Sequence, residues 1–384
     1  MRILQVQTQA EAGGAQRISD MLGEGLRARG HDVRTVFLYR KTDVYDRDPH
    51  ADFILARPPK GSLGQMHAAL GLIRHMRRAR PDAVLSFQHY GNIAGTLGAR
   101  LCGARSIIAN QSGAPQTGGL RGLLTQVDKL MGMAGLYHAN VVNSAWTEAQ
   151  FDAFPQAYRK RLKRIAHGVA TPTENADKAA ARAAFGLPPH VPLVLSSGRL
   201  AASKNQAVLV GALALAPHLH LAIAGTGPEE GNLLTLAVNL HVRDRLHLVG
   251  EVPPARIFTF LAAGDAYAFC SRTETFGLAA VEAAIAGLPV VAGDLDVLKE
   301  VLTTADGAAA ALFVRPDAGG IAEGLTDILA NPGLASALSS AGCKLREQYA
   351  PDAMCAAYEA LLLHGRGTAA MPSITSSAPE RLSV

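Results

Sequence analysis

Residues 270–293 read CSRTETFGLAAVEAAIAGLPVVAG, and they hold the end of one predicted strand, a polar loop, a helix and the next strand. Glu274 lies in the polar loop, Gly277 begins the helix, and Glu282 follows on that helix with the spacing E-x7-E. Short apolar strands joined by a helix are typical of a βαβ unit in a parallel sheet that is buried on both faces. This segment therefore predicts an α/β fold.

The same alternation of strand and helix continues along most of the chain. In the first half, strands are predicted at residues 2–6, 32–38, 83–87, 106–109 and 139–143, with helices at 14–29, 63–80, 92–101 and 120–136. In the second half, strands are predicted at 193–197, 219–224, 246–249, 266–269 and 289–291, with helices at 205–215, 229–240, 254–262, 278–286 and 321–330. The pattern predicts two doubly wound, Rossmann-like domains.

A polar segment that contains prolines separates the two halves. It comprises TPTENA at 171–176 and LPPHVP at 187–192, a composition that suits a domain linker. We expect one domain at 1–171, a second at 172–350, a helix at 351–365 and a mobile tail at 366–384. Two α/β domains of similar size predict a ligand cleft between them.

Composition narrows the functional class. The 384 residues are 48% hydrophobic and 18% charged, which excludes a disordered chain. A net charge of +5 suits anionic small molecules or an anionic membrane, but it is too weak to indicate nucleic acid. The four cysteines form no C-x-x-C pair, and no apolar stretch is long enough for a signal peptide or a spanning helix. We expect a cytoplasmic protein, and a peripheral position on the inner face of the plasma membrane is the open alternative.

Two constellations carry candidate chemistry. In SSGRLAASKN at 196–205, Arg199 and Lys204 flank a strand-to-helix turn, where two cations can neutralise a diphosphate without a metal ion. Glu274 and Glu282 are carboxylates that can hold vicinal hydroxyls of a sugar or a ribose. The alternative is structural: the cations belong to a solvated loop, Glu274 complements the helix dipole, and Glu282 is an exposed helix residue.

Weaker signals lie elsewhere. Gly13 and Gly14, in EAGGAQ after the first strand, allow close approach of a ligand to the backbone. His89 follows a strand end, where pocket residues gather, although a lone histidine is commonly structural. Gly225 and Gly227 form only part of a G-x-G-x-x-G pattern, so we expect a tight turn there. No H-E-x-x-H, G-x-S-x-G or P-loop pattern is present, and metal ligation is not indicated.

Two basic clusters lie in the first half of the chain. The first comprises Arg74, Arg77, Arg78 and Arg80, and the second comprises Arg159, Lys160, Arg161, Lys163 and Arg164. Such clusters suit contact with anionic lipid headgroups, and the alternative is a solvated helix face.

Together, these motifs resemble glycosyltransferase family 4, a family of retaining enzymes with the GT-B architecture. The resemblance covers about residues 1–365 and depends on EAGGAQR, RARGHDV, VVNSAWT, HGV at 167–169, SSGRLAASKNQ, LAIAGTGP, LHLVGEV and TETFGLAAVEAAIAGLPVV, in that order. It implies transfer of a hexose or related sugar from a nucleoside diphosphate sugar to a hydroxyl, with retention at the anomeric carbon. It also implies a cell-surface glycan or a lipid-linked molecule as acceptor, no metal and no further cofactor.

The resemblance implies a role for each candidate residue. Arg199 and Lys204 would hold the diphosphate, and Glu274 would hold hydroxyls of the transferred sugar. The remaining donor contacts would come from Glu282 on the ribose, the amides of Phe276, Gly277 and Leu278, the main chain near Val252, and Gly13 and Gly14 of the first domain. The helix at 351–365 would cross back to pack on the first domain.

The chain departs from the family pattern at several positions. Asn110 stands where many members have a histidine that contacts the donor sugar, and His89 is the candidate substitute. Thr275 replaces a glycine that is common after the first glutamate. Two other functions remain open: a nucleotide-sugar epimerase on the same fold, and a catalytically silent sugar-nucleotide-binding protein.

Overall fold

The computed structural model describes residues 1–11, 13–111, 113–115, 117–172 and 176–364. These residues form two compact units, and the chain passes from the first to the second between Gly168 and Val169. The sequence places this boundary at residue 171. The predicted tail at 366–384 lies outside the described residues, as do residue 365 and positions 173–175 of the predicted linker.

The N-terminal unit contains a seven-stranded parallel sheet in the order β3-β2-β1-β4-β5-β6-β7. Its strands are β1 (Arg2–Ala10), β2 (Asp32–Arg40), β3 (Ala51–Leu55), β4 (Ala83–Phe87), β5 (Ser106–Asn110), β6 (Ala139–Val142) and β7 (Leu162–Arg164). The two central strands read VLS and IIA where they are fully buried, because helices cover both faces of the sheet.

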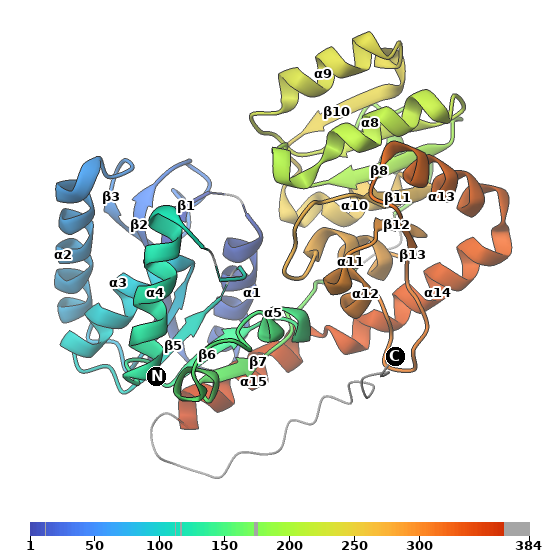
Figure 1. Ribbon diagram of the computed structural model, residues 1–384. Helices are drawn as coiled ribbons and strands as arrows, with labels where there is room; N and C mark the ends of the chain where they lie inside the picture. Colours follow the sequence, from blue (N-terminus) through green and yellow to red (C-terminus); the bar gives the residue numbers. More distant parts are fainter. Residues whose placement is uncertain (12, 112, 116, 173–175, 365–384) are drawn as a thin grey trace. The chain divides into compact units, whose positions relative to one another are not determined.

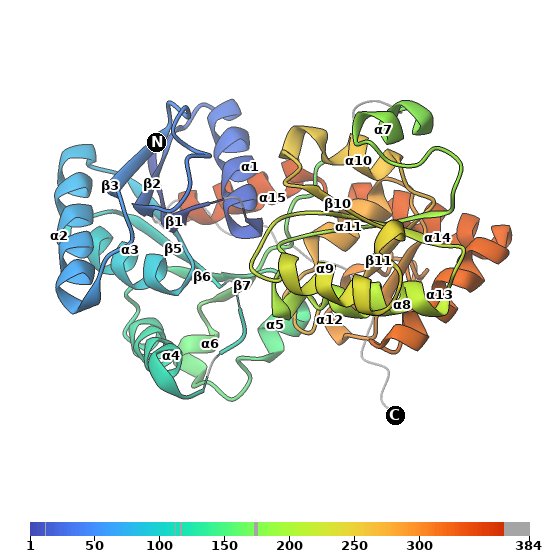
Figure 2. The ribbon, with the colours of Figure 1, turned by 90° about the horizontal axis from the view of Figure 1, so that it is seen from above.

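Helices cover the two faces of this sheet unequally. They are α1 (Gly14–Ala28), α2 (Gly61–Ala79), α3 (His89–Leu101), α4 (Gly119–Met133), the short α5 (Ala145–Ala149) and α6 (Gln156–Arg159), and α15 (Pro351–His364). The helices α2, α3 and α4 pack side by side on one face, and α1 and α15 pack on the other (Figures 1 and 2). This arrangement follows from right-handed crossovers on either side of β1.

The C-terminal unit repeats this plan with a six-stranded parallel sheet in the order β10-β9-β8-β11-β12-β13. Its strands are β8 (Leu193–Ser197), β9 (His220–Ala224), β10 (Leu246–Gly250), β11 (Ala266–Phe269), β12 (Val290–Gly293) and β13 (Leu312–Val314). Its helices are α7 (Lys178–Ala184), α8 (Gln206–Leu215), α9 (Glu230–Asn239), α10 (Ile257–Ala262), α11 (Leu278–Ile285), α12 (Asp296–Val301), α13 (Ala318–Ala330) and α14 (Pro332–Gln348). The 3-10 turns are η1 (Ala202–Lys204), η2 (Arg243–Arg245) and η3 (Pro254–Arg256).

The last helix, α15, belongs to the N-terminal unit although it follows the C-terminal unit in the chain. Arg29, which follows α1, pairs with Asp352 at 2.7 Å and with Glu359 at 3.2 Å. On the buried side of the helix, the hydroxyl of Tyr358 donates to Oδ1 of Asn110 at 2.5 Å. These contacts join α15 to α1 and to the end of β5.

Replacing Tyr358 with phenylalanine is expected to destabilise the N-terminal unit by about 1–2 kcal/mol, because Oδ1 of the buried Asn110 loses its donor. Hydrogen exchange of the β5 amides should then become faster. Tyr349→Phe is the matched control, since the Tyr349 hydroxyl donates to Val301 at 3.0 Å in the other unit. Equal exchange of β5 in Tyr358→Phe and the wild type would show that this bond does not hold α15 in place.

Candidate functional site

The strand order of the C-terminal sheet places most candidate residues at one edge. The strands β9 and β10 lie on one side of β8, and β11 to β13 lie on the other, so the order reverses between β8 and β11. All strands are parallel, and their carboxyl ends therefore meet at the same edge. In open α/β sheets, ligands bind outside this edge at the point of reversal. Arg199 and Lys204 follow β8, Glu274 follows β11, and Val252 follows β10.

Hydrogen bonds from side chains and main chain connect the loops that follow β8 and β11. The ammonium of Lys204 donates to Oε1 of Glu274 at 2.6 Å. The guanidinium of Arg272 donates to Oδ1 of Asn205 at 3.2 Å, and its amide donates to the carbonyl of Ser203 at 2.9 Å. These contacts hold a cation and a carboxylate side by side at the point of reversal.

The Lys204–Glu274 pair is better shielded than an ordinary surface ion pair. The side chain of Lys204 is 32% exposed and that of Glu274 is 11% exposed. Lys204 also lies 5.9 Å from the ring centroid of Phe269. Arg199 is more exposed, and its carbonyl accepts a bond of 3.0 Å from the side chain of Gln206. A polyanion that enters this edge can reach both cations while Glu274 still offers a second oxygen to a hydroxyl.

The loop after β9 supports the loop after β8 through close backbone contact. The amide of Gly198 donates to Ala224 at 2.9 Å, and the amide of Gly225 donates to Gly250 at 2.7 Å. Gly225 has φ 141°, and a Cβ atom there would lie 2.0 Å from the carbonyl oxygen of Gly198. The expected tight turn does not lie at Gly225–Gly227 itself: these residues bond to the neighbouring loops and link the loops after β8, β9 and β10, and the turn follows at Pro228 and Glu229.

Replacing Gly225 with alanine is expected to destabilise the C-terminal unit by about 3 kcal/mol, because the new Cβ forces the backbone of Gly198 to move and its own φ is unfavourable. The free energy of unfolding, measured in urea, checks this value. Gly231→Ala is the control, since a Cβ atom there would meet nothing within 4 Å. Equal stability of the two variants would show that the loops are not held by this contact.

The helix α11 begins directly beside the ion pair. Gly277 is its N-cap residue with φ 79°, and a Cβ atom there would lie 2.5 Å from Cδ2 of Leu298. The Phe276 side chain is buried against the Tyr349 ring with 5.1 Å between centroids, so this side chain anchors the loop. The first amides of a helix lack intrahelical acceptors and favour an anion. The start of α11 at Gly277 and Leu278 thus offers such amides three and four residues after Glu274, the partner of Lys204.

Glu282 lies one further turn along α11 and is only 3% exposed, which contradicts the alternative that it is an exposed helix residue. On the neighbouring strand β11, the hydroxyl of Tyr267 lies 2.8 Å from the hydroxyl of Ser197. Burial raises the pKa of Tyr267, and the charges of Glu282 and Glu274 raise it further. Both carboxylates therefore lie within electrostatic range of the same ring, on the two sides of the α11 N-terminus.

Val252 is half-buried two residues beyond β10. Because Gly250 accepts the amide of Gly225, this loop continues the row formed by the loops after β9, β8 and β11. A ligand that spans this row would meet main chain at one end, cations in the middle and carboxylates at the other end.

In the N-terminal unit, the remaining candidates also lie at carboxyl ends of strands. Gly13 is the N-cap of α1 and Gly14 its first residue, and both are exposed. His89 is the first residue of α3, two positions beyond the end of β4, so it lies in a helix where the sequence predicts a loop. Burial, with Arg121 adding to it, lowers the pKa of His89, and its imidazole is therefore neutral at pH 7.

Asn110 is 7% exposed, and both ends of its side-chain amide have partners inside the unit. Its Nδ2 donates to the carbonyl of Ser86 at 2.9 Å, and its Oδ1 accepts from Tyr358. The residue therefore joins β4, β5 and α15. A contact of Asn110 with substrate stays a prediction.

Sequence reasoning assigned no role to a polar network beyond β6 and β7. Asn143 lies 2.9 Å from Nε2 of His167, and Thr147 donates to Oδ1 of Asn143 at 3.1 Å. Burial lowers the pKa of His167 to about 4, so this imidazole is also neutral at pH 7. The motifs VVNSAWT and HGV contain these residues, and their polar composition at a strand end was the available signal.

The two predicted basic clusters lie on different elements, the first mainly on α2 and the second partly on β7. Lys163 and Arg164 of the second cluster lie in the edge strand β7, and Arg164 lies 3.8 Å from Glu148. Within the described part of the chain, no three or more His, Cys, Asp or Glu side chains come together as a metal site. No helix among those residues is long and apolar enough to cross a membrane.

Two family models match the chain. The model described as "Glycosyl transferases group 1" matches residues 177–345, and the model described as "Glycosyl transferase 4-like domain" matches residues 13–198. Together they span residues 13–345, which include most of both units, and they overlap at residues 177–198.

Curated relatives match part of the chain. The D-inositol 3-phosphate glycosyltransferase of Mycolicibacterium gilvum is 35% identical over 40% of this chain and 36% of its own length. The enzyme of the same name from Mycolicibacterium smegmatis is 32% identical over 57% of this chain and 52% of its own length. The chain thus spans between about a third and a half of these two relatives.

Solved structures match nearly the whole chain. HepE from Anabaena, in complex with UDP and glucose, superposes with a TM-score of 0.79 at 18% identity and covers 95% of this chain and 99% of its own. Sucrose-phosphate synthase from Thermosynechococcus elongatus superposes with a TM-score of 0.79 at 22% identity and covers 94% and 98%. At these identities, the similarity shows the GT-B fold.

Proposed function

This chain belongs to the family 4-like glycosyltransferases of the GT-B fold, and on that premise we propose that it moves a sugar from a nucleoside diphosphate sugar to a hydroxyl, with retention at the anomeric carbon and without a metal ion. The observation that carries the proposal is the Lys204–Glu274 pair, 2.6 Å apart beside the α11 N-terminus. A cation, a carboxylate and helix amides at one sheet edge suit a ligand that joins a diphosphate to a polyhydroxyl ring.

Each donor group has a matching partner in this arrangement. Arg199, Lys204 and the amides from Phe276 to Leu278 hold the diphosphate, while Glu274 accepts from hydroxyls of the sugar. Glu282 accepts from the ribose hydroxyls, and the main chain near Val252 lies against the base. A contact of the donor with Gly13 and Gly14, whose backbone is exposed, stays a prediction.

The reaction breaks the bond between the anomeric carbon and the diphosphate oxygen, and the electron pair leaves with the diphosphate. Arg199 and Lys204 stabilise this charge as it develops. The acceptor oxygen bonds to the anomeric carbon on the same face, and its proton passes to the departing phosphate oxygen. Glu274 is occupied by Lys204 and sugar hydroxyls, so no carboxylate acts as covalent nucleophile.

The acceptor belongs to the N-terminal unit in this proposal, as a cell-surface glycan or a lipid-linked molecule at an anionic membrane. Large apolar side chains are exposed on the face formed by α2, α3 and α4, namely Leu63, Met66, Leu70, Leu97, Leu101, Leu120, Leu123, Leu130 and Met133. Arginines at 74, 77, 78, 100 and 121 lie on the same helices. Exposed leucines among arginines suit the interface of an anionic membrane.

The experiment that tests the proposal is a donor panel. Purified protein is incubated with UDP-, GDP- and ADP-sugars, UDP-glucose first because solved structures of the same fold contain UDP or UDP-glucose. Release of the nucleoside diphosphate is measured with and without candidate acceptors, inositol phosphate among them because of the curated relatives.

Release from one donor that is lost in Glu274→Ala and Glu282→Ala supports the transferase. Conversion of a donor to its epimer without release would instead favour a nucleotide-sugar epimerase. Binding without release or conversion would indicate a silent sugar-nucleotide-binding protein.

A further inference from the structure

A pocket of about 350 Å³ lies at the edge of the N-terminal sheet opposite the carboxyl ends of its strands. Arg2 begins β1, Asp82 immediately precedes β4, and Arg105 immediately precedes β5. The ends of α2 and α3 complete the lining with Arg77, Arg80, Leu101 and Cys102. Since β4 has five residues and a parallel strand rises about 3.3 Å per residue, the pocket lies about 17 Å from the carboxyl edge. It is therefore separate from the candidate site.

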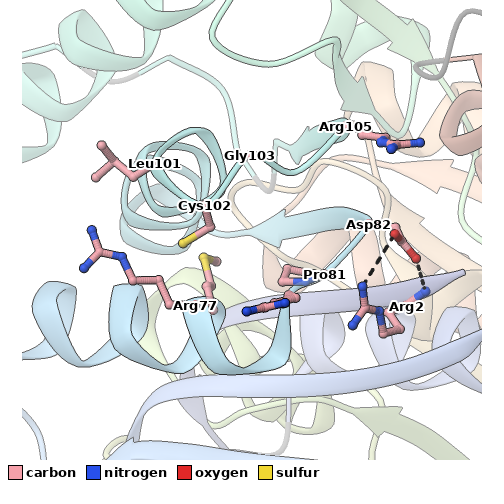
Figure 3. A pocket seen from close by; sticks show the side chains of 10 residues that line it. Arg2, Arg77, Pro81, Asp82, Leu101, Cys102, Gly103 and Arg105 are labelled. Carbon is pink, nitrogen blue, oxygen red and sulfur yellow. Dashed lines mark hydrogen bonds and ion pairs between the residues drawn. The ribbon is translucent and has the colours of Figure 1, made fainter.

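Four arginines and a single carboxylate line this pocket. Asp82 is already engaged, because it accepts the amide of Arg2 at 2.8 Å and lies 3.9 Å from that residue's guanidinium. Figure 3 shows Arg77 and Leu101 on one side of the pocket and Arg2, Asp82 and Arg105 on the other. Among the described residues, Arg77, Arg80 and Arg105 form no ion pair with a carboxylate. The lining thus carries an uncompensated positive charge.

The structure divides the basic cluster at 74–80 into two kinds of residue. Arg77 and Arg80 line the pocket, whereas Arg74 and Arg78 lie on the same helix outside it. Arg80 caps α2 in the left-handed region with φ 46° and ψ 58°, where glycine is usual. Arg80 therefore adopts an unfavourable backbone conformation before Pro81, which costs stability, while its side chain lines the pocket.

We propose that this pocket binds a phosphate group, carried by a phosphomonoester or a diphosphate, through Arg77, Arg80 and Arg105. The guanidinium fork matches phosphate oxygens with two parallel hydrogen bonds, and three such groups neutralise a dianion. No aromatic side chain lines the pocket, so the site recognises the charged group and not a nucleotide base. The proposal goes beyond sugar transfer and does not depend on it.

The surroundings favour a lipid headgroup as the source of the phosphate. Leu101, at the pocket, is 64% exposed, and Leu130 and Met133 are exposed at the end of the neighbouring helix α4. Apolar side chains beside a phosphate site would contact the acyl region while the arginines hold the headgroup. A free phosphorylated molecule has the same charged chemistry, and the experiment separates the two sources.

Cys102 provides a local readout, because it lines the pocket and is half-buried. Cys270 and Cys355 are buried, so Cys343→Ser leaves Cys102 as the accessible thiol. In this background the rate of alkylation by iodoacetamide is measured with inorganic pyrophosphate and with chloride at equal ionic strength. We expect pyrophosphate to slow the alkylation of Cys102 at least fivefold relative to chloride. Pyrophosphate bound at Arg199 and Lys204 would not protect Cys102.

The variants make the test specific. Arg77→Gln and Arg105→Gln should each bring the ratio of the two rates close to 1, while Arg74→Gln and Arg78→Gln keep the wild-type ratio. Arg80→Gly should lose protection without lowering Tm, because glycine relieves the left-handed cap, and this result excludes unfolding as the cause. Absence of protection, or equal loss in Arg74→Gln and Arg78→Gln, would overturn the proposal.

Vesicles then identify the source. Protection of Cys102 by vesicles that contain phosphatidic acid, whose headgroup is a phosphomonoester, but not by phosphatidylcholine vesicles, assigns the site to a lipid headgroup. Protection by pyrophosphate alone assigns it to a free phosphorylated ligand, and it would contradict membrane docking through this end of the unit while leaving the phosphate site in place.

Discussion

Replacing Lys204 with alanine is expected to lower kcat for sugar transfer by about 100- to 1000-fold and to change the KM for the donor much less. The charge on the diphosphate grows as the glycosidic bond breaks, so a cation beside it stabilises the transition state more than the bound donor. Removing Lys204 also leaves Glu274 next to the diphosphate without its partner at 2.6 Å. Steady-state release of the nucleoside diphosphate measures both constants.

Two further variants separate these contributions. Lys344→Ala is the matched control, because Lys344 pairs with Asp306 at 2.8 Å in an exposed position of the same unit. In Lys204→Ala combined with Glu274→Gln, the repulsion between carboxylate and diphosphate is absent, and the loss should be smaller than the product of the single losses. An unchanged kcat in folded Lys204→Ala would show that the leaving group is stabilised elsewhere.

The central strands of both sheets could be predicted because burial on two faces leaves a largely apolar run, as in the segment IIA of β5. Three strands were missed: Ala51–Leu55, Leu162–Arg164 and Leu312–Val314. Each lies at an edge of its sheet. An edge strand has one neighbour and partial cover, so it tolerates short and polar sequences such as LKR, whose periodicity is weak. The fourth edge strand, β10, reads LHLVG and was predicted at 246–249.

Helix α14 was also missed, although its start carries two local signals. Asn331 caps the helix by accepting the amide of Leu334 at 3.1 Å, and Pro332 occupies the first helical position. Asparagine at the N-cap followed by proline is a favourable start for a helix. The small and polar residues that follow in α14 weaken its apolar periodicity, and the cap was the better guide.

The candidate site was predictable as a set of residue types, but its assembly was not. Parallel strands bring the residues after β8 and β11 to one edge, and this step follows from the fold class alone. The bonds that fix the loops, from Arg272 to Asn205 and from Gly198 to Ala224, join residues that no local pattern relates. The engagement of Asn110 by Tyr358, 248 residues later, is likewise a product of the returning helix α15.

Replacing Glu282 with glutamine is expected to raise the KM for the donor by about 10- to 100-fold with little change in kcat. In the proposed function this carboxylate accepts hydrogen bonds from two ribose hydroxyls, which lie away from the glycosidic bond that breaks. Its hydrogen bonds are then as strong in the bound donor as in the transition state, so their loss weakens binding uniformly. The contrast with Lys204→Ala distinguishes a binding carboxylate from a group that stabilises the leaving diphosphate.

A donor that lacks the ribose 2′-hydroxyl tests whether the effect arises at the ribose. Glu282 is 3% exposed, and a substitution there could also act by loosening α11. If Glu282 binds the ribose, the wild type should lose affinity for the deoxy donor, and Glu282→Gln should lose much less on the same change, because the hydrogen bond is already weakened. If the change to the deoxy donor instead lowers the affinity by the same factor in the variant as in the wild type, the two changes are independent. Glu282 then supports the helix without touching the ribose.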